Sequence, residues 1–315
     1  MKLLEGGIRQ MLEREFINRL GQKIFYRVWP VENARATIHI YHGMAEHGAR
    51  YAEFAEYMNN EGFAVFCHDH MGHGNSLGEE GLKGYFNKKN GWEHASIDGY
   101  DIDMIINEEY KGIPHFIFGH SMGSFMARKN IADHSDIYDA AVICGTGGSQ
   151  GAIGVIGKGL ASFKQALFGA KHKDMMLNVI IFGGYNAKFK SEGPFAWLSK
   201  DREMVEKYIA DPLCGFTCTS SFYKDLIGGT IIANDPAVAK KIRKDLPILL
   251  ISGEDDPVGN FSKGVEQSCK LYKDAGIEDV RLALIKNGRH EILNDDTKHE
   301  SLDIIAGFYR EFLSE

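Results

Sequence analysis

The sequence predicts an α/β protein in which a mostly parallel sheet is covered by helices on both faces. Short apolar strands alternate with helix-like segments over residues 36–144, and again after residue 245. Strands that are apolar along their whole length are typical of parallel sheets, because both faces of such sheets are buried. Glycine-rich or polar segments follow several of these strands, which is where active sites gather in open parallel sheets.

Each element follows from a local pattern of apolar residues and from the glycines that interrupt it. Turn residues around Gly21 separate two β-prone runs, and Gly62 ends a helix-like run. The expected elements, in order, are a hairpin at 16–29, a strand at 36–41, a helix at 52–60, a strand at 63–67, a helix at 93–110, a strand at 116–118, a helix at 122–133, a strand at 140–144, a strand at 246–252, a helix at 261–275, a strand at 280–285 and a closing helix at 297–313.

Residues 147–235 break this alternation. The segment is glycine-rich at its start and then carries apolar and aromatic residues at helical spacing, without a clear strand or repeat. Long insertions in a compact domain are usually functional. We therefore expect a helical lid at 147–235, inserted between a first core segment at 1–146 and a second at 236–315. The alternative is a set of ordinary crossover helices that pack on the core.

Composition excludes several functions. The chain has 315 residues and a net charge of −7, with lysines and arginines scattered rather than gathered into a stripe, so we expect no nucleic-acid partner. Its five cysteines form an odd set without a C-x-x-C pair, which favours a reduced, cytoplasmic protein. Residues 1–7 lack the apolar core of a signal peptide, and no window reaches the roughly 18 apolar residues of a membrane span.

The pattern Gly119-x-Ser121-x-Gly123 lies between a predicted strand and a predicted helix and is typical of a nucleophile elbow. A serine on such a turn has a strained backbone, and the flanking glycines leave room for it. The turn exposes the hydroxyl and directs the backbone N–H of Met122, at the start of a helix, toward any oxyanion that forms there.

An activated serine requires a base and an acid that orients the base. In the chain order of α/β-hydrolases the acid and the histidine follow the serine, each after a strand. Asp256 follows the strand at 246–252, and His290 follows the strand at 280–285. The sequence thus predicts the triad Ser121, Asp256 and His290. Asp255 is the alternative acid, although Pro257 biases Asp256 toward an extended conformation.

A second oxyanion donor is expected in the loop after residue 41. There Gly43 allows close approach of the backbone, so we assign the N–H of Met44 to the oxyanion hole beside that of Met122. The histidine-rich run at 68–73 could suggest zinc. However, a tight turn points neighbouring side chains apart and no second cluster completes the site, so we expect neither a metal nor another cofactor.

Four motifs stand out along the chain, which are HGMAEHxxRY at 42–51, DHMGHGxS at 69–76, GHSMG at 119–123 and DPLC at 211–214. They give the chain, over residues 22–313, a resemblance to the monoglyceride lipase and lysophospholipase branch of the α/β-hydrolases, the serine-aminopeptidase-like hydrolases. It implies a serine esterase with a lid over an acyl-chain pocket, and it supports the same triad. It also implies that Glu46 and Arg50 shape the glycerol end of the site, whose alternative is an ion pair that stabilises the oxyanion loop.

These observations predict hydrolysis of an acyl ester, such as a monoacylglycerol or a lysophospholipid, through an acyl-enzyme. Phe163, Leu167 and Phe168 in the lid are expected to hold the acyl chain, unless they only pack the lid onto the body. We expect transient contact of the lid with a membrane surface. The alternatives are a small-substrate esterase, thioesterase or peptidase on the same triad, and a ligand-binding protein that has kept the fold without turnover.

Overall fold

The computed structural model describes residues 10–78 and 80–313, and the segment at residues 1–7, which lacks the apolar core of a signal peptide, lies outside the described residues. The described residues form an eight-stranded sheet in the order β1-β2-β4-β3-β5-β6-β7-β8. The strands are β1 (Leu12–Ile17), β2 (Lys23–Trp29), β3 (Ala36–Tyr41), β4 (Phe63–His68), β5 (His115–His120), β6 (Ala140–Cys144), β7 (Ile248–Gly253) and β8 (Val280–Ile285).

From β4 to β8 every neighbouring pair of strands is parallel, whereas β1 and β2 pair antiparallel with each other and β2 pairs antiparallel with β4. This arrangement confirms the predicted mostly parallel sheet. The hairpin begins at Leu12, four residues before the predicted start. Its first strand alternates half-buried and exposed residues, and its charged members hid the strand from a search for apolar runs.

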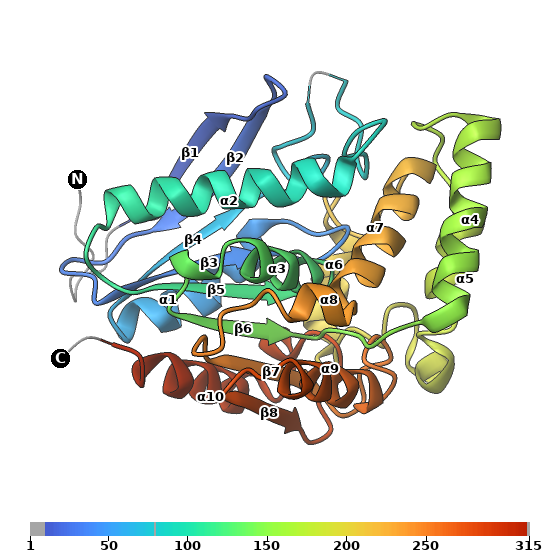
Figure 1. Cartoon of the computed structure of the whole chain (residues 1–315). Coiled ribbons are helices and arrows are strands. Elements are labelled where there is room, and N and C mark those ends of the chain that lie inside the picture. The colour runs from blue at the N-terminus through green and yellow to red at the C-terminus, as the bar shows by residue number, and fades with distance from the viewer. Residues whose placement is uncertain (1–9, 79, 314–315) are drawn as a thin grey trace.

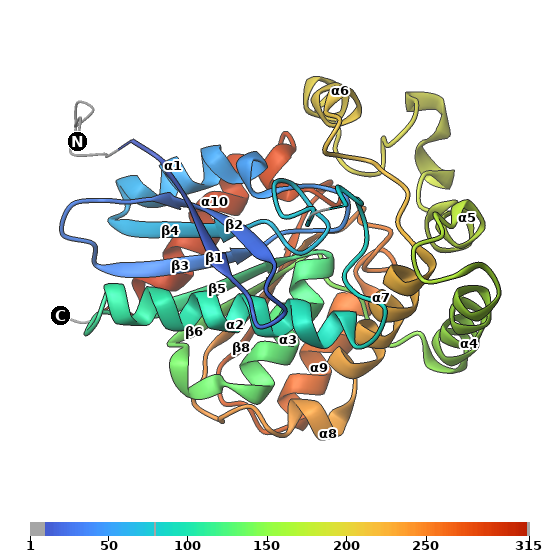
Figure 2. The ribbon, with the colours of Figure 1, turned by 90° about the horizontal axis from the view of Figure 1, so that it is seen from above.

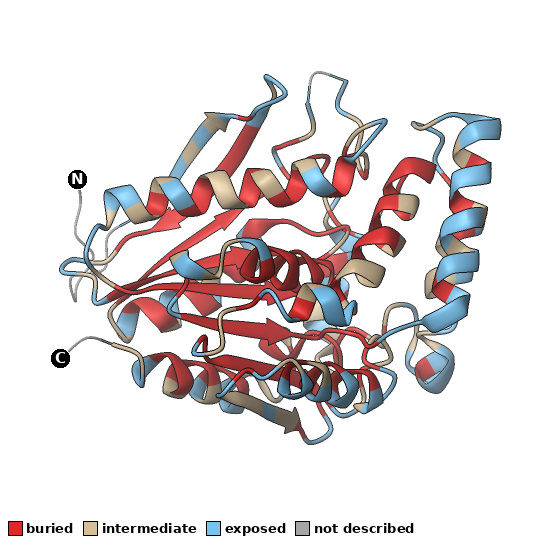
Figure 3. Ribbon diagram, in the orientation of Figure 1, coloured by how far each residue is buried: buried red, intermediate tan, exposed pale blue. Residues whose placement is uncertain are grey.

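Helices cover both faces of the sheet (Figures 1 and 3). The helices α1 (Ala52–Asn60) and α10 (Lys298–Arg310) pack on one face, where they share an apolar core with β3, β4, β5 and β6. The opposite face is covered by α2 (Gly91–Glu109), α3 (Met122–Asp133), α8 (Pro236–Ala239) and α9 (Lys263–Asp274). Short 3-10 helices occur at Gly48–Tyr51, Ser135–Ile137 and Ile292–Asn294.

Between β6 and β7 the chain forms α4 (Gly151–Phe168), α5 (Met175–Phe182), a 3-10 helix at Ala187–Glu192, α6 (Arg202–Ala210) and α7 (Ser220–Ala233). These helices stand beyond the carboxyl ends of β5 and β6 (Figures 1 and 2). Gly154 and Ala161 are buried on the inner side of α4, where Gly154 faces Ile231 of α7. Small residues here let the two helices approach closely, so the larger apolar residues of α4 turn outward.

No helix in the described ranges is long and apolar enough to cross a membrane. The five cysteines are buried and none of them forms a disulfide within the described part of the chain. Burial raises the pKa of Cys67 and Cys144 well above the usual value of a thiol, so both sulfurs stay protonated.

Candidate active site

Ser121 occupies a sharp turn between β5 and α3 with φ of 52° and ψ of −119°. A non-glycine residue in this conformation stores about 1–3 kcal/mol of strain. The flanking glycines are required by close contacts. A Cβ at Gly119 would lie 2.6 Å from the carbonyl oxygen of Gly123, and one at Gly123 would lie 1.9 Å from that of Tyr41. The turn therefore has the geometry expected of a nucleophile elbow.

The structure brings Asp256 and His290 together after β7 and β8. Oδ2 of Asp256 lies 2.9 Å from Nδ1 of His290, and both side chains are buried. The carboxylate of Asp256 also accepts hydrogen bonds from the Val258 N–H at 2.8 Å and from the Ser252 hydroxyl at 3.2 Å, which hold it in place. Asp255 points elsewhere and pairs with Lys188 of the insertion at 2.6 Å.

A cavity of about 810 Å³ lies between the sheet and the insertion, and Ser121 and His290 both line it. Met44 and Met122 line the same cavity, Met44 in the loop after β3 and Met122 as the first residue of α3. The first turn of a helix presents N–H groups without a partner inside the helix, which favours negative charge near them. Ser121, His290, Met44 and Met122 thus line one cavity, whereas Asp256 is not among the described residues that line it, and the further walls come mainly from the insertion.

Glu46 and Arg50 hold the loop after β3. Oε1 of Glu46 accepts the N–H of Gly43 at 2.6 Å, and Oε2 pairs with Arg50 at 2.6 Å. Arg50 also pairs with Glu291, beside His290, at 2.6 Å. Burial opposes charge on Glu46, but Arg50 and His120 outweigh it and hold the pKa of the carboxyl well below its usual range. Glu46 lines the cavity, Arg50 is not among the described residues that line it, and the two form an ion pair.

The three side chains that were expected to hold the acyl chain lie outside the cavity. Phe163, Leu167 and Phe168 are 64%, 61% and 53% exposed and are not among the described residues that line the cavity. Because α4 packs through its small residues, these side chains project outward. The insertion lines the cavity instead with residues of α4, α5 and α7 and of the intervening loops, including Ile153, Gly157, Val179, Ile181, Phe182, Trp197, Leu226 and Ile227.

The histidine-rich run after β4 does not gather around a common point. Asp69 pairs with the buried Arg27 at 2.9 Å, and Nε2 of His68 contacts Nδ1 of His70 at 2.8 Å. His73 Nδ1 donates to the carbonyl of Met71 at 3.0 Å. The run thus supports the loop beside the elbow, as its interpretation as a packed turn predicts.

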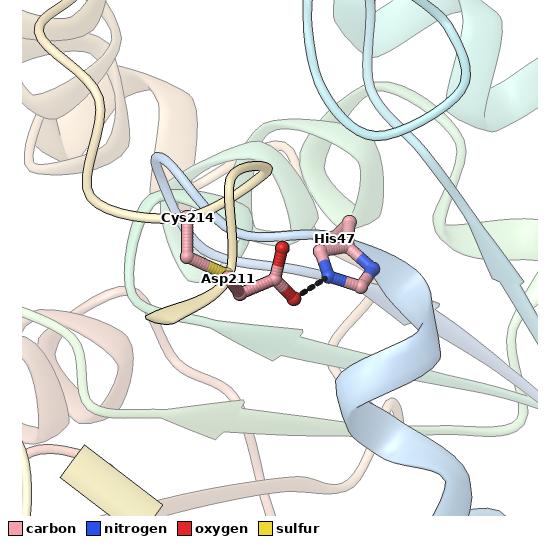
Figure 4. A group of neighbouring side chains, drawn as sticks. All are labelled: His47, Asp211 and Cys214. Carbon is pink, nitrogen blue, oxygen red and sulfur yellow. Dashed lines mark hydrogen bonds and ion pairs between the residues drawn. The ribbon is translucent and has the colours of Figure 1, made fainter. Parts of the chain in front are cut away.

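His47, Asp211 and Cys214 lie close together where the loop after β3 meets the insertion, with ligand-type atoms within 4.8 Å of one another (Figure 4). Nε2 of His47 is hydrogen-bonded to Oδ2 of Asp211 at 2.9 Å. Burial raises the pKa of the Cys214 thiol well above its usual value, which disfavours the thiolate that a metal would bind. The N–H of Gly215 also donates to the carbonyl of Ala45 at 2.9 Å. The group is therefore best described as a clasp between core and insertion.

Two residues beside the site were not predicted. His120 Nε2 donates to the carbonyl of His290 at 3.2 Å, so it ties the elbow to the histidine loop. The ring centroids of Trp197 and His290 are 5.1 Å apart, and Trp197 lines the cavity. The position of His120 directly before Ser121 was a usable signal. Trp197 lies in an irregular segment 93 residues before His290 in sequence, and nothing local indicated the contact.

Comparison with known proteins agrees with this geometry. The family model described as serine aminopeptidase, S33, matches residues 32–297. The human monoglyceride lipase is 27% identical over 277 residues, which cover 87% of this chain and 82% of the human protein. A Monkeypox virus monoglyceride lipase homolog is 33% identical over 123 residues, and this match covers only 38% of this chain and 42% of the viral protein.

Among solved structures, a thermostable carboxyl esterase from Bacillus coagulans in complex with glycerol superimposes with a TM-score of 0.90 at 26% identity, covering 97% of this chain and 100% of the esterase. The family match, these similarities and the elbow geometry lead to the same assignment. The chain belongs to the serine aminopeptidase family and is a monoglyceride lipase-like α/β-hydrolase.

Proposed function

We propose that this protein cleaves carboxylic esters of acyl lipids, monoacylglycerols or lysophospholipids, through an acyl-enzyme on Ser121. Its similarity to monoglyceride lipases and to an esterase makes it a carboxylic ester hydrolase. The observation that carries the finer proposal is the 2.9 Å contact between Asp256 and His290 at a cavity that Ser121 also lines.

In the proposed mechanism His290 takes the proton of the Ser121 hydroxyl through Nε2, because Asp256 engages Nδ1. The serine oxygen attacks the ester carbonyl, and the N–H groups of Met44 and Met122 stabilise the oxyanion. Collapse of the tetrahedral intermediate releases the alcohol, which receives the proton from His290. Water then repeats the sequence on the acyl-enzyme and releases the fatty acid. Asp256 keeps His290 in the required tautomer and stabilises its transient positive charge.

The segment at 147–235 is proposed to act as the lid over an acyl-chain pocket. The volume of about 810 Å³ is large enough for a long chain, and apolar side chains such as Phe182 and Leu226 line it. Each buried CH₂ contributes about 0.8 kcal/mol, so medium and long chains are favoured over acetyl. A small-substrate esterase, thioesterase or peptidase on the same triad is the second candidate, and the size of the cavity counts against it.

The test is turnover of p-nitrophenyl esters of C2 to C16 chains, followed by a panel of monoacylglycerols and lysophospholipids. We expect Ser121→Ala to abolish turnover, and the matched control Ser162→Ala, at an exposed serine of α4, to leave it unchanged. Activity of Ser121→Ala near that of the unmutated protein would overturn the proposal. A strict preference for C2 would favour the second candidate, and failure of a fluorophosphonate to label the protein would favour a ligand-binding role without turnover.

The outward face of the lid is proposed to contact a lipid surface. Ten large apolar side chains of α4 and α5 are between 47% and 76% exposed, and we call this set the lid face. They are Ile153, Val155, Ile156, Phe163, Leu167, Phe168, Met175, Met176, Val179 and Ile180. Large apolar side chains exposed together in such number are typical of surfaces that contact a protein or a membrane. Three members of the lid face, Ile153, Val179 and Ile180, also line the cavity, which makes the surface continuous with the pocket.

Cosedimentation with phosphatidylcholine vesicles tests this contact. We expect the double variant Ile156→Ser with Phe163→Ser to lose most of its vesicle binding while turnover of a soluble C4 ester stays within about twofold, since neither residue lines the cavity. The matched control is Ile209→Ser, which removes an apolar residue that is 46% exposed on α6, outside the lid face. Equal binding by both variants would refute the proposed surface.

A further inference from the structure

A row of buried imidazoles crosses the face of the sheet beneath α2. Nδ1 of His39, on β3, lies 2.6 Å from Oδ1 of Asp103, and its Nε2 lies 2.9 Å from Nδ1 of His68 at the end of β4. Nε2 of His68 lies 2.8 Å from Nδ1 of His70. Nε2 of His70 lies 3.1 Å from the carbonyl oxygen of His42. We call His39, His68 and His70 the imidazole row. Their side chains and that of Asp103 are at most 1% exposed.

Asp103 ends the row as a carboxylate. Besides its contact with His39, the carboxylate accepts hydrogen bonds from Nε2 of His115 at 2.9 Å, from the Tyr41 hydroxyl at 2.6 Å and from the Tyr138 hydroxyl at 2.5 Å. Burial opposes the charge, but the neighbouring histidines outweigh it and hold the pKa of Asp103 well below its usual range. Because all four neighbours donate to its oxygens, a proton on the carboxyl would face another donor. Asp103 is therefore the acceptor in every contact.

Protons can be counted along the row. Its four contacts each need one proton, and three neutral imidazoles supply one each, which leaves one contact without a proton. If His39 donates to Asp103, His68 donates to His39 and His70 donates to His68, then Nε2 of His70 presents a lone pair to the carbonyl oxygen of His42. Two acceptors would face each other at 3.1 Å in a buried site, which is costly. One additional proton removes the conflict.

We propose that His39, His68 and His70 share one additional proton, paired with Asp103, and that this charge makes them positioning residues for the oxyanion loop. The proposal builds on the esterase mechanism proposed above. With the added proton, Nε2 of His70 donates to the carbonyl of His42, which belongs to the same peptide unit as the N–H of Gly43 that donates to Glu46.

The next amide after that peptide unit is the N–H of Met44, the proposed oxyanion donor. His70 thus fixes the carbonyl oxygen of this peptide unit, while Glu46 fixes its N–H. Moving one proton across each hydrogen bond shifts the charge from one ring to the next without breaking a contact. Burial lowers the pKa of His68 and of His70, and repulsion from neighbouring histidines lowers each further. Within the row, His39 is the ring that lies directly beside the Asp103 carboxylate, at 2.6 Å. The other titratable groups around the row are His42, His73, His115, Tyr41 and Tyr138.

Imidazole ¹⁵N spectra of the full chain at pH 8 test the proton count directly. An ordinary histidine, with a pKa of about 6.5, is neutral there. We expect one persistent imidazolium signal that is lost in Asp103→Asn and in His39→Gln. The pKa of His120 is also raised, because Glu46 outweighs burial, so its signal is assigned by its loss in His120→Gln. Three neutral rings in the row at pH 8 would overturn the proposal, and this readout does not depend on enzymatic activity.

Kinetics test the positioning role. A glutamine at position 39 can donate to Asp103 and accept from His68, so His39→Gln keeps both contacts but leaves the row one proton short. We expect kcat for a soluble C4 ester to fall about tenfold with KM within twofold, less than the 10²–10³ lost with an oxyanion donor. The matched control Tyr138→Phe removes a donor to the other oxygen of Asp103 and should stay within twofold.

An equal loss in both variants, or an unchanged kcat in His39→Gln, would reduce the row to a structural feature and refute the positioning role. Absence of esterase activity in the unmutated protein would instead refute the proposed function, while the imidazolium signal at pH 8 would still decide the proton count.

Discussion

Arg128 on α3 provides the sharpest stability prediction, because it is a buried cation that holds both ends of the insertion. Its side chain is 1% exposed, and none of its hydrogen-bond partners among the described residues is a carboxylate. The five N–H groups of the guanidinium lie within hydrogen-bond distance of six acceptors, on Tyr272, Thr146, Gly147, Ser268, Ala233 and Asn234, so one N–H is shared between two of them. Gly147 lies just before α4, and Ala233 and Asn234 lie at the end of α7, so a single side chain fixes where the insertion leaves and rejoins the core.

The cost of Arg128→Met follows from the acceptors left behind. The carbonyl of Gly147 keeps donors from Ser268 and Asn234, whereas the carbonyl of Ala233 and Oδ1 of Asn234 lose theirs. A buried group without its partner costs about 1–3 kcal/mol, and hydrogen bonds to a charged donor contribute about 1.5–3 kcal/mol each. Relief of the desolvation of the cation offsets part of this loss. We expect the free energy of unfolding to fall by about 3–5 kcal/mol.

Urea unfolding followed by circular dichroism measures this loss, with m values compared to check that the transition is of the same kind. The control Arg310→Met removes an arginine that makes one surface ion pair with Glu61 at 3.1 Å, and we expect less than about 1 kcal/mol. A loss below about 1 kcal/mol for Arg128→Met, or equal losses for the two variants, would refute the view that this cation anchors the insertion.

Three further predictions concern the site itself. Asp256→Asn should lower kcat for ester hydrolysis about 10⁴-fold, because His290 would then adopt the wrong tautomer. In the control Asp255→Asn, kcat should stay within about threefold. Similar losses in the two variants would contradict the assignment. Gly123→Ala should fail to give folded, soluble protein, because its Cβ would lie 1.9 Å from a backbone carbonyl, whereas Gly159→Ala, with open space around the Cβ, should fold normally. Because the pKa of Glu46 is depressed, its carboxylate should stabilise the fold fully above about pH 4.5 and lose this effect as pH falls through the folded-state pKa. The difference in unfolding free energy between the unmutated protein and Glu46→Gln should therefore persist at pH 5 and shrink below pH 4; a difference that shrank between pH 7 and 5 would refute this reasoning.

Much of the core could be predicted from sequence because local patterns determine it. The helix over residues 122–133 and the strand over 140–144 have the predicted bounds in the structure. The elbow could be located because Gly119-x-Ser121-x-Gly123 is a local pattern between a strand and a helix, although the contact that requires Gly123 is with the distant Tyr41. The placement of Asp256 and His290 after consecutive strands could be anticipated because strand ends meet at the same edge of a parallel sheet.

The remainder depended on contacts between distant segments. The sequence left Asp255 and Asp256 open because the two are adjacent, and the contact of Asp255 with Lys188, 67 residues away in sequence, distinguishes them. Phe163 and its neighbours were expected to face the pocket because they are apolar or aromatic residues at helical spacing, but α4 is apolar on more than one side. Its inner side is set by the small residues that pack on α7, and no rule of periodicity reveals which of two apolar faces is buried.

The imidazole row was hidden for the same reason. His39, His68 and Asp103 belong to three different elements, and only the register between β3 and β4 with α2 above them brings the rings into line. In sequence, His68 and His70 were interpreted as part of a tight, packed turn, and nothing there indicated a hydrogen-bonded row. Buried polar networks of this kind depend on tertiary geometry, which a pattern of residue types does not contain.

The central claim is that Ser121 is a nucleophile activated by His290. The most direct measurement is labelling by a fluorophosphonate at neutral pH, with the modified peptide mapped by mass spectrometry. We predict a single label on Ser121 that is lost in His290→Gln and kept in His299→Gln, which alters an exposed histidine of α10. A label on another residue, or undiminished labelling of Ser121 in His290→Gln, would contradict the account.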